Sequence, residues 1–388
     1  MFGYRRIIYW LLVASSFVKS ETPEDQVESQ DFCEKISRLP LCDCSNITKQ
    51  VVCKNVNDSE SNVVFKINFL VGMKIVQCIH ADIPSLEAFP DLTEYINTPQ
   101  VFLDNCPVTM NGSLYDYTSK ISKNMKHLFL DIYGENDVDR DFNTNYFKRL
   151  SSLESIILRV HRMIEFRVPL ENLFEELVNL KTLLFNNLPT PNGIFDSLKQ
   201  LESLFILDYF LHPSDLHDNI FKNQRKLEFL SIKGFSVDYF HPQLFANMTE
   251  LDTLMLMKIS IESIPEYMLQ HNHKLKKFHM TDSVLNISNL PCKLFANKWN
   301  LKTILLRSNN HEHLPEDLFE NSTNISKITI TGNQLSSLPK NSFKDQIHLN
   351  SLDLSNNSLV NLTDGLFDSL TSLRVLILSH NKLSSLSK

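Results

Sequence analysis

The stretch LNSLDLSNNSLVNL at residues 349–362 places leucine at positions 349, 352, 354, 359 and 362 and asparagine at position 357. Over its whole length this spacing fits neither the 3.6-residue period of a helix nor the two-residue period of a strand. Only the centre alternates, because Asp353 separates Leu352 from Leu354, as in a short strand with one buried face. The stretch therefore predicts a short strand between two bends that turn further leucines inward.

A second copy, LRVLILSHNKLSSL, follows at residues 373–386, and the step from Leu349 to Leu373 is 24 residues, as it is from Asn357 to Asn381. Both copies fit L-x-x-L-x-L-x-x-N-x-L, the pattern of a leucine-rich repeat. One repeat cannot bury its apolar face alone, so neighbouring repeats must stack into a solenoid. The sequence predicts an α/β leucine-rich-repeat solenoid, a horseshoe with a parallel β-sheet on its concave face.

Earlier repeats start at steps of 21 to 28 residues, at Ile325, Leu301, Leu275, Leu251, Leu227, Leu201, Leu180, Leu153 and Met125. Weaker copies start near Thr98 and Leu70, which gives about 12–13 repeats over residues 70–388, the last of them incomplete. A phenylalanine recurs late in the repeats and is expected near the outer bend, at Phe221, Phe245, Phe295, Phe319, Phe343 and Phe367.

An asparagine recurs at the bend after the strand in the late repeats, at Asn309, Asn333, Asn357 and Asn381. Its amide is expected to bond buried backbone groups of the turn, which would otherwise stay unpaired. Equivalent earlier positions carry other residues, among them Leu188, Phe235, Ile259 and Ser283. Either apolar side chains fill the bend there, or the middle of the arc has a different curvature.

The N-terminus has the features of a secretory signal peptide at residues 1–20. Arg5 and Arg6 precede a short apolar run, and the residues before Glu21 suit cleavage. No later run approaches the ~20 apolar residues of a membrane helix. Nine N-x-[ST] sequons support glycosylation on an extracellular protein, at Asn46, Asn57, Asn111, Asn247, Asn286, Asn321, Asn324, Asn356 and Asn361.

Four cysteines at residues 21–69, Cys33, Cys42, Cys44 and Cys53, predict a disulfide-stapled N-terminal cap over the open end of the solenoid. Cys42 and Cys44 are poorly placed to pair with each other, which favours Cys33–Cys44 with Cys42–Cys53 among the three connectivities that four cysteines allow. A zinc site is the alternative. Cys78 and Cys106 occupy equivalent positions in the two weak repeats and are candidates for a further bridge. Cys292 is left over and is expected to be a small buried apolar residue.

Charge and motifs exclude other classes of function. The net charge is -7 and no long basic run occurs, so nucleic acid is not an expected partner. No hydrolase, metalloprotease or phosphate-loop motif is present. The pairs at His271 and His273 and at His311 and His313 have no further ligand-spaced residues and are expected to be solvated loop histidines. We therefore expect no catalytic residue, metal or cofactor, and no enzymatic activity.

The cysteine cluster, the segment VVFKINFLVGMKIVQC and repeats such as LPEDLFENSTNISKITITGNQLSSLP together resemble the ectodomain of an arthropod Toll receptor. The resemblance implies a receptor on the extracellular side of the plasma membrane for a Spätzle-type cystine-knot cytokine, bound near the N-terminal concave part of the arc, with a receptor dimer forming on ligand binding. It also implies Cys33–Cys44, Cys42–Cys53 and Cys78–Cys106. The family continues into further repeats, a membrane helix and a cytoplasmic TIR domain, so we expect the chain to be a fragment or a truncated form, secreted if it ends at residue 388.

The outward strand position four residues after each repeat start predicts a row of side chains along the concave face: Lys74, Phe102, Phe129, Ile157, Leu184, Phe205, Ser231, Met255, His279, Leu305, Thr329, Asp353 and Ile377. The members from Phe102 to Phe205 are apolar and predict a ligand-binding stripe, with Asp131 and Arg159 as polar rim. The alternatives are that neighbouring side chains shield the stripe or that the register is off by one residue. A leucine-rich-repeat adhesion or matrix protein is the alternative function.

Overall fold

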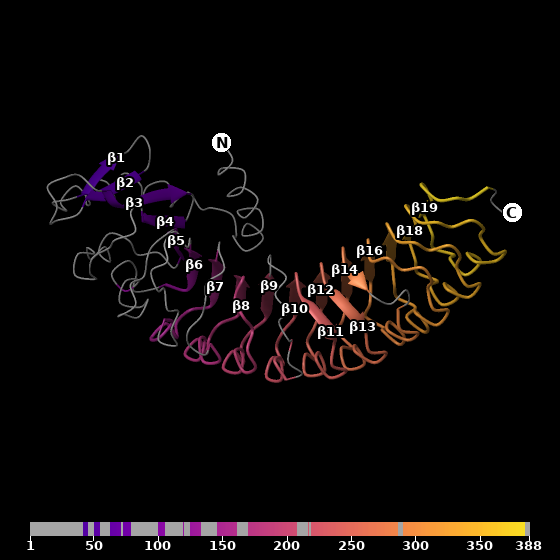
Figure 1. Cartoon of the computed structure of the whole chain (residues 1–388), viewed down its shortest axis with the longest axis horizontal. Coiled ribbons are helices and arrows are strands. Elements are labelled where there is room, and N and C mark those ends of the chain that lie inside the picture. The colour runs from indigo at the N-terminus through magenta and orange to yellow at the C-terminus, as the bar shows by residue number, and fades with distance from the viewer. Residues whose placement is uncertain are drawn as a thin grey trace. The chain divides into compact units, whose positions relative to one another are not determined.

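Figure 1 shows the computed structural model of the chain, which describes residues 125–132, 146–160, 170–207, 219–285 and 290–384, positions 119 and 216, and five strands before residue 105. For those five strands and for residues 131, 132, 284 and 285 the description is limited to the backbone. The chain divides into two compact units, residues 1–107 with 117–125 and residues 108–116 with 126–388. The predicted signal peptide lies outside the described residues.

The first unit contains strands whose backbone places cysteines in a defined register. Cys42 lies directly opposite Cys53 in an antiparallel pair, and Cys78 lies opposite Phe65 in another. Cα atoms of directly opposed antiparallel residues are ~4.5–5.5 Å apart, which is within the range of a disulfide. The Cys42–Cys53 bridge stays a prediction, and Cys33 and Cys106 lie outside the described residues. Four antiparallel strands are followed by one parallel strand: β1 (Cys42–Ser45), β2 (Gln50–Lys54), β3 (Val63–Leu70), β4 (Met73–Cys78) and β5 (Gln100–Asp104).

The second unit is a parallel β-solenoid with one long sheet, and in Figure 1 its strands follow the inner side of the unit's curve while the connecting turns follow the outer side. The strands of this sheet are β6 (His127–Ile132), β7 (Ser155–Val160), β8 (Thr182–Asn186), β9 (Ser203–Leu207), β10 (Phe229–Lys233), β12 (Thr253–Met257), β14 (Lys277–Thr281), β16 (Thr303–Arg307), β17 (Lys327–Thr331), β18 (Ser351–Asp353) and β19 (Val375–Ile377). A small parallel sheet joins β11 (Ser236–Tyr239), β13 (Ser260–Ser263) and β15 (Val284–Leu285).

The leucines of the repeat pattern form the core. Leu349, Leu352, Leu354 and Leu359 are each 0% exposed. The strands alternate between buried and outward residues, as in the pattern of β9 and β16. The spacing of the stretch at 349–362 is thus explained by Leu352 facing inward on β18, Leu354 facing inward directly after it, and Leu349 and Leu359 facing inward from the bends on either side.

The connecting segments correct the α/β class expected from the sequence, because none of the described segments between strands is an α-helix. They form successive turns instead, with i to i+3 hydrogen bonds such as Leu318 N to Pro315 O at 3.3 Å and Ser322 N to Phe319 O at 3.0 Å. Proline opens this segment, and Asn321, with a φ of 56°, closes it. The segment is therefore only about two α-helical turns long, which leaves an isolated helix marginal.

The asparagine prediction is confirmed at the late bends. Asn357 donates from Nδ2 to the carbonyl of Ile330 in the preceding repeat at 2.7 Å, and its Oδ1 accepts from the backbone N–H of Leu335 at 3.2 Å. Asn309, Asn333 and Asn381 make the same type of bonds to their preceding repeats. The amides therefore join consecutive repeats as well as closing their own turns.

Earlier bends follow the first of the two alternatives. Leu188, Phe235 and Ile259 are 7%, 2% and 0% exposed, so apolar side chains fill the space of the asparagine. Ser283 is intermediate: its hydroxyl accepts from the backbone N–H of Ile259 at 3.2 Å, as an asparagine oxygen would.

Phenylalanines form a buried spine on the outer side of the core, as predicted from their spacing. Phe295 stacks on Phe319 with ring centroids 6.0 Å apart, and Phe319 stacks on Phe343 at 6.1 Å. Phe195, Phe221 and Phe245 form an earlier run of the same kind. Stacked pairs of this type stabilise by ~0.5–1.5 kcal/mol beyond their burial.

A second ladder of polar side chains, not predicted from the sequence, runs beside this spine. Each member lies three residues after a spine position and bonds the carbonyl of the spine residue in the preceding repeat. Gln224, Asn272, Ser322 and Gln346 bond Phe195, Phe245, Phe295 and Phe319 in this way. Lys298 takes the same place, with its ammonium bonded to the carbonyl of Leu269.

Lys298 is the one charged member of this outer ladder among the described residues. It is 4% exposed, and burial lowers the pKa of its ammonium to about 8. Because the unfolded chain takes up the proton at higher pH than the folded chain, the buried charge lowers stability as pH falls from 10.5 to about 8, and the loss is complete below pH 8.

Lys298→Gln is expected to raise the free energy of unfolding at pH 7 by about 1 kcal/mol, because glutamine keeps the carbonyl bond and removes the buried charge. Urea unfolding followed by circular dichroism measures this. Lys293→Gln is the matched control, since Lys293 is exposed and its ion pair with Glu320 is long, at 3.8 Å. Equal stability of Lys298→Gln and wild type at pH 7 would contradict the prediction.

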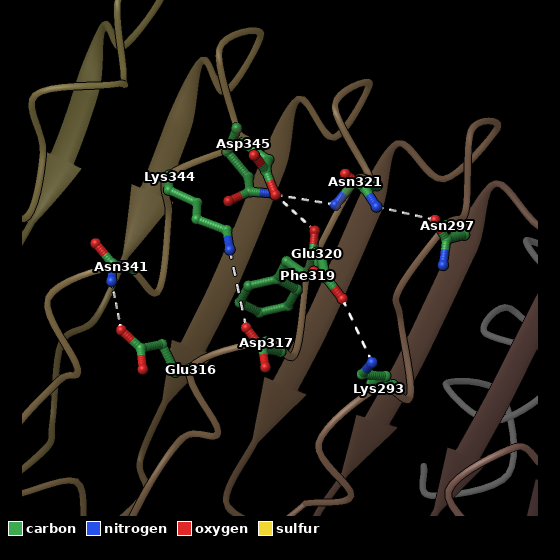
Figure 2. Close-up of polar contacts among 11 residues, drawn as sticks. Lys293, Asn297, Glu316, Asp317, Phe319, Glu320, Asn321, Asn341, Lys344 and Asp345 are labelled. Carbon is green, nitrogen blue, oxygen red and sulfur yellow. Dashed lines mark hydrogen bonds and ion pairs between the residues drawn. The ribbon is translucent and has the colours of Figure 1, made fainter.

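Figure 2 shows that the solvent side of the turns carries further contacts between repeats, among them Asn341 to Glu316 at 2.6 Å and Lys344 to Asp317 at 3.9 Å. Asn321 donates to Asn297 at 3.1 Å in the same region. Exposed pairs of this type contribute ~0–1 kcal/mol each. The stacking of repeats therefore depends mainly on the buried leucines, the spine and the two buried ladders.

Candidate functional site: the outward face of the sheet

The outward row predicted along the sheet has the expected register within the second unit. Phe129 pairs with Ile157, Ile157 with Leu184, and Leu184 with Phe205. The same register continues strand by strand to Ile377 in β19. In the first unit the predicted register, which placed Lys74 beside Phe102, is wrong by one residue. Phe102 pairs with Ile75 there, and Lys74 pairs with Val101. The weak repeat there lacks a leucine pattern that could fix the register.

In the described part of the row, exposure differs from the prediction at Leu184 and at Ser231, which is 2% exposed. Phe129, Ile157 and Phe205 are half-buried, as expected of side chains on a solvated sheet face. Leu184 is only 4% exposed and is flanked on both sides by Ile157 and Phe205. The apolar stripe is therefore interrupted at Leu184, and a partner would contact its neighbours.

Apolar side chains next to the row were missed because only the central outward position was considered. Phe229 lies on β10 with its ring 4.7 Å from that of Phe205. Leu207 on β9 and Met257 on β12 are also half-buried, and they lie beside Met255 of the predicted row. Reading the first and third outward positions of each strand would have found them. We call Phe205, Leu207, Phe229, Met255 and Met257 the central apolar patch.

The rim residues predicted for the stripe lie on adjacent strands, where Asp131 pairs with Arg159. The side chain of Asp131 lies outside the described part of the structure. Asn186, two residues after Leu184, is 7% exposed and bonds both backbone groups of Val160, at 2.8 and 3.0 Å. Its amide thus holds the ends of β7 and β8 together and does not point to a ligand.

Charged residues that directly precede β6, β7 and β8 form an ion-pair network at the N-terminal ends of these strands. Glu154 lies between Lys126 at 2.7 Å and Lys181 at 2.9 Å. Hydrogen bonds from these two ammonium groups lower the pKa of Glu154 to about 2. The neighbouring His127 has a lowered pKa because it is partly buried, an effect that Glu154 opposes. At physiological pH these strand ends therefore carry an ionised carboxylate between two lysines.

The sequons with described side chains lie outside the strands. Asn247, Asn321, Asn356 and Asn361 are exposed and Asn324 is partly exposed. Asn356, three residues after the end of β18, adopts a φ of 54° in the turn. Glycans at these positions would leave the outward sheet face open, and their presence stays a prediction. Asn46, Asn57, Asn111 and Asn286 lie outside the described residues.

Two single-residue predictions are corrected. Cys292 is exposed rather than buried, because it follows Pro291 on the solvent side of the turn. His311 is 0% exposed rather than solvated, whereas His313, His271 and His273 are exposed as expected. Among the described residues no cluster of three or more His, Cys, Asp or Glu side chains could hold a metal ion.

Comparison with known proteins places this geometry in a family. The model of the BspA-type leucine-rich repeat region matches residues 171–291 and 288–388, in six copies. The chain belongs to the BspA-type leucine-rich repeat family. Its solenoid is of the kind that typically serves as a non-enzymatic binding scaffold. No curated protein sequence matches the chain, and no helix in the described part is both long and apolar enough to cross a membrane.

Solved structures with a similar fold include receptor ectodomains. The chain is similar to one in the Toll–Spätzle complex of Drosophila, with 24% identity and a TM-score of 0.70, over 91% of this chain and 49% of that one. In the TLR13–ssRNA13 complex the values are 17%, 0.54, 80% and 38%, and in the mouse RP105/MD-1 complex 18%, 0.53, 74% and 52%. The chain thus spans about half the length of these proteins or less, and at this identity the likeness concerns the fold.

Proposed function

We propose that the chain is the extracellular ligand-binding part of a Toll-type transmembrane receptor in innate immune or developmental signalling. The observation that carries this proposal is the row of half-buried apolar side chains Phe129, Ile157 and Phe205 on one sheet face. Exposed apolar side chains that gather on one sheet face in this way are typical of protein-binding sites. The ligand is a Spätzle-type cystine-knot cytokine, a class supported by the likeness in fold to the Toll–Spätzle complex, and its binding brings two receptor chains together.

In this proposal the membrane span and the TIR domain belong to a part of the receptor beyond Lys388. The exposed sequons and the predicted signal peptide support an extracellular position. Sequencing of the transcript beyond Lys388 distinguishes the alternatives. A membrane span with a TIR domain supports the receptor, whereas a cap followed by a stop codon or a lipid-anchor signal supports an adhesion or matrix protein.

Phe129→Asp, Ile157→Asp and Phe205→Asp, made singly, are each expected to weaken cytokine binding at least about tenfold, because a carboxylate must be desolvated in an apolar contact. Binding of the secreted chain to immobilised cytokine is measured by surface plasmon resonance. Ile347→Asp is the control, since Ile347 is 43% exposed on an outer turn and should bind normally. Unchanged binding by all three variants, with normal secretion, would rule out this site.

A further inference from the structure

The long sheet of the second unit has acidic residues on β6 and β18, Asp131 and Asp353, but none on the strands between them. Its strands β7, β8, β9, β10, β12, β14, β16 and β17 contain no aspartate or glutamate. The same strands carry five basic residues, Arg159, Lys233, Lys277, Arg307 and Lys327. Over the whole chain acidic residues outnumber basic ones, 45 to 38. The positive character of this face is therefore a local feature that the net charge of -7 conceals.

Three of these basic side chains and one histidine gather on three neighbouring strands, β14, β16 and β17. We call Lys277, His279, Arg307 and Lys327 the basic sheet patch. Lys277 and Lys327 both pair with Thr303 from opposite sides, so their Cα atoms are ~10 Å apart. Arg307 lies at the far end of β16, ~13 Å along the strand from Thr303. Lys277, Arg307 and Lys327 are exposed, and His279 is half-buried between them.

These cations are not neutralised by the chain itself. Lys274 and Lys276 each form an ion pair, with Glu250 at 2.5 Å and Asp252 at 2.6 Å, but none forms to Lys277, Arg307 or Lys327 among the described residues. Asp252, whose carboxylate feels the charge of Lys277, is already bound by Lys276 and Thr253.

Two cations of the patch, Lys277 and Lys327, both act on His279. Burial lowers the pKa of this imidazole first, and the positive charges of Lys277 and Lys327 lower it further. No carboxylate contributes a change in the opposite direction. The two lysines therefore create a shared positive potential over the centre of β14–β17.

Apolar side chains lie between and beside the cations. Met255 and Leu305 occupy the same outward row as His279, on the strands to either side, and both are half-buried. Cations ~10 Å apart around an apolar centre match a segment that presents carboxylates and apolar side chains on the same face. The dense charge of a sulfated polysaccharide, which has no apolar groups, would leave this centre unused.

We infer that the basic sheet patch binds an acidic segment of a protein partner, in which carboxylates flank apolar side chains. This contact lies on β12–β17, separate from Phe129, Ile157 and Phe205, and does not depend on the proposed cytokine site. The partner's carboxylates contact Lys277, Lys327 and Arg307, and its apolar side chains cover Leu305 and Met255.

The test uses the secreted chain and a short fluorescent peptide with glutamate and leucine on the same face of an extended strand, Glu-Ser-Leu-Ser-Glu, with binding measured by fluorescence anisotropy. The Lys277→Gln/Lys327→Gln variant is compared with Lys199→Gln/Lys340→Gln, which makes the same change in net charge at exposed positions on outer turns. Both pairs are exposed, so neither variant disturbs the core, and circular dichroism checks the fold.

We expect the patch variant to lose at least about tenfold in affinity and the control variant less than about twofold, since only the patch charges face the peptide. Raising the salt concentration from ~0.05 M to ~0.5 M should weaken wild-type binding by screening. The inference is overturned if wild type does not bind the peptide, if both variants lose affinity equally, or if heparin binds to the patch and the peptide does not.

Discussion

Replacing Asn333 with alanine is expected to lower the free energy of unfolding by about 3 kcal/mol, because buried backbone groups in two repeats lose their partner. Asn333 is 7% exposed, and its Nδ2 donates to the carbonyls of Leu306 at 2.9 Å and Thr331 at 3.1 Å. Its Oδ1 accepts from the backbone N–H groups of Asn309 at 3.0 Å and His311 at 3.3 Å. Urea unfolding, with hydrogen exchange of these two amides, measures the loss.

Asn341→Ala is the matched control for this change. Asn341 is also hydrogen-bonded, to Glu316 at 2.6 Å, but is exposed on an outer turn, so its loss should cost less than about 1 kcal/mol. Asn333→Asp separates the two functions of the amide, because it keeps the acceptor oxygens and places a carboxylate against two carbonyls. It should destabilise at neutral pH at least as much as alanine. If Asn333→Ala and Asn341→Ala lower the free energy of unfolding equally, the asparagine ladder does not stabilise the solenoid as proposed.

The strand register of the second unit could be predicted from the sequence because a slip of one residue would turn every core leucine to the solvent face. Leu352 and Leu354 must both face the core, which leaves Asp353 outward, and the 24-residue step carries this choice to the neighbouring repeats. Between Lys74 and Phe102 no such pair of leucines exists, and the register predicted there is wrong by one residue.

The outer ladder and the burial of Leu184 could not be predicted in the same way. Gln224, Asn272 and Gln346 differ in residue type, and only a fixed distance from the spine and a shared carbonyl target relate them. The exposure of Leu184 depends on the side chains of the two adjacent strands, a property of the stacked sheet that one repeat does not contain. The basic sheet patch likewise emerges only when Lys277 and Lys327 are brought to the same face.

The burial of His311 could have been predicted from the repeat pattern. In the repeat that starts at Leu301, the pattern leads through Ile304, Leu306 and Asn309 to position 311, where the neighbouring repeats have leucine. Leu335 and Leu359, its equivalents, are each 0% exposed, and so is His311. The histidine therefore occupies a core leucine position, and neither ring nitrogen has a hydrogen-bond partner among the described residues.

Burial lowers the pKa of the His311 imidazole from 6.5 to about 4. The unfolded chain then takes up a proton near pH 6.5, while the folded chain resists protonation until about pH 4. The stability associated with the neutral imidazole is fully present above pH 6.5 and is lost as pH falls through this window. The loss between pH 7 and pH 4 is about 3 kcal/mol by linkage.

His311→Leu is accordingly expected to stabilise the chain at pH 7 by about 1–2 kcal/mol, by removing two unpartnered nitrogens from an apolar site. Its advantage over wild type should grow by about 3 kcal/mol on acidification to pH 4, because leucine does not titrate. Urea unfolding at several pH values measures the difference between the two proteins, in which the titration of all other groups cancels. His313→Leu, an exposed change two residues away, should show no such growth. A difference between His311→Leu and wild type that is independent of pH would mean that the imidazole is solvated or paired in solution.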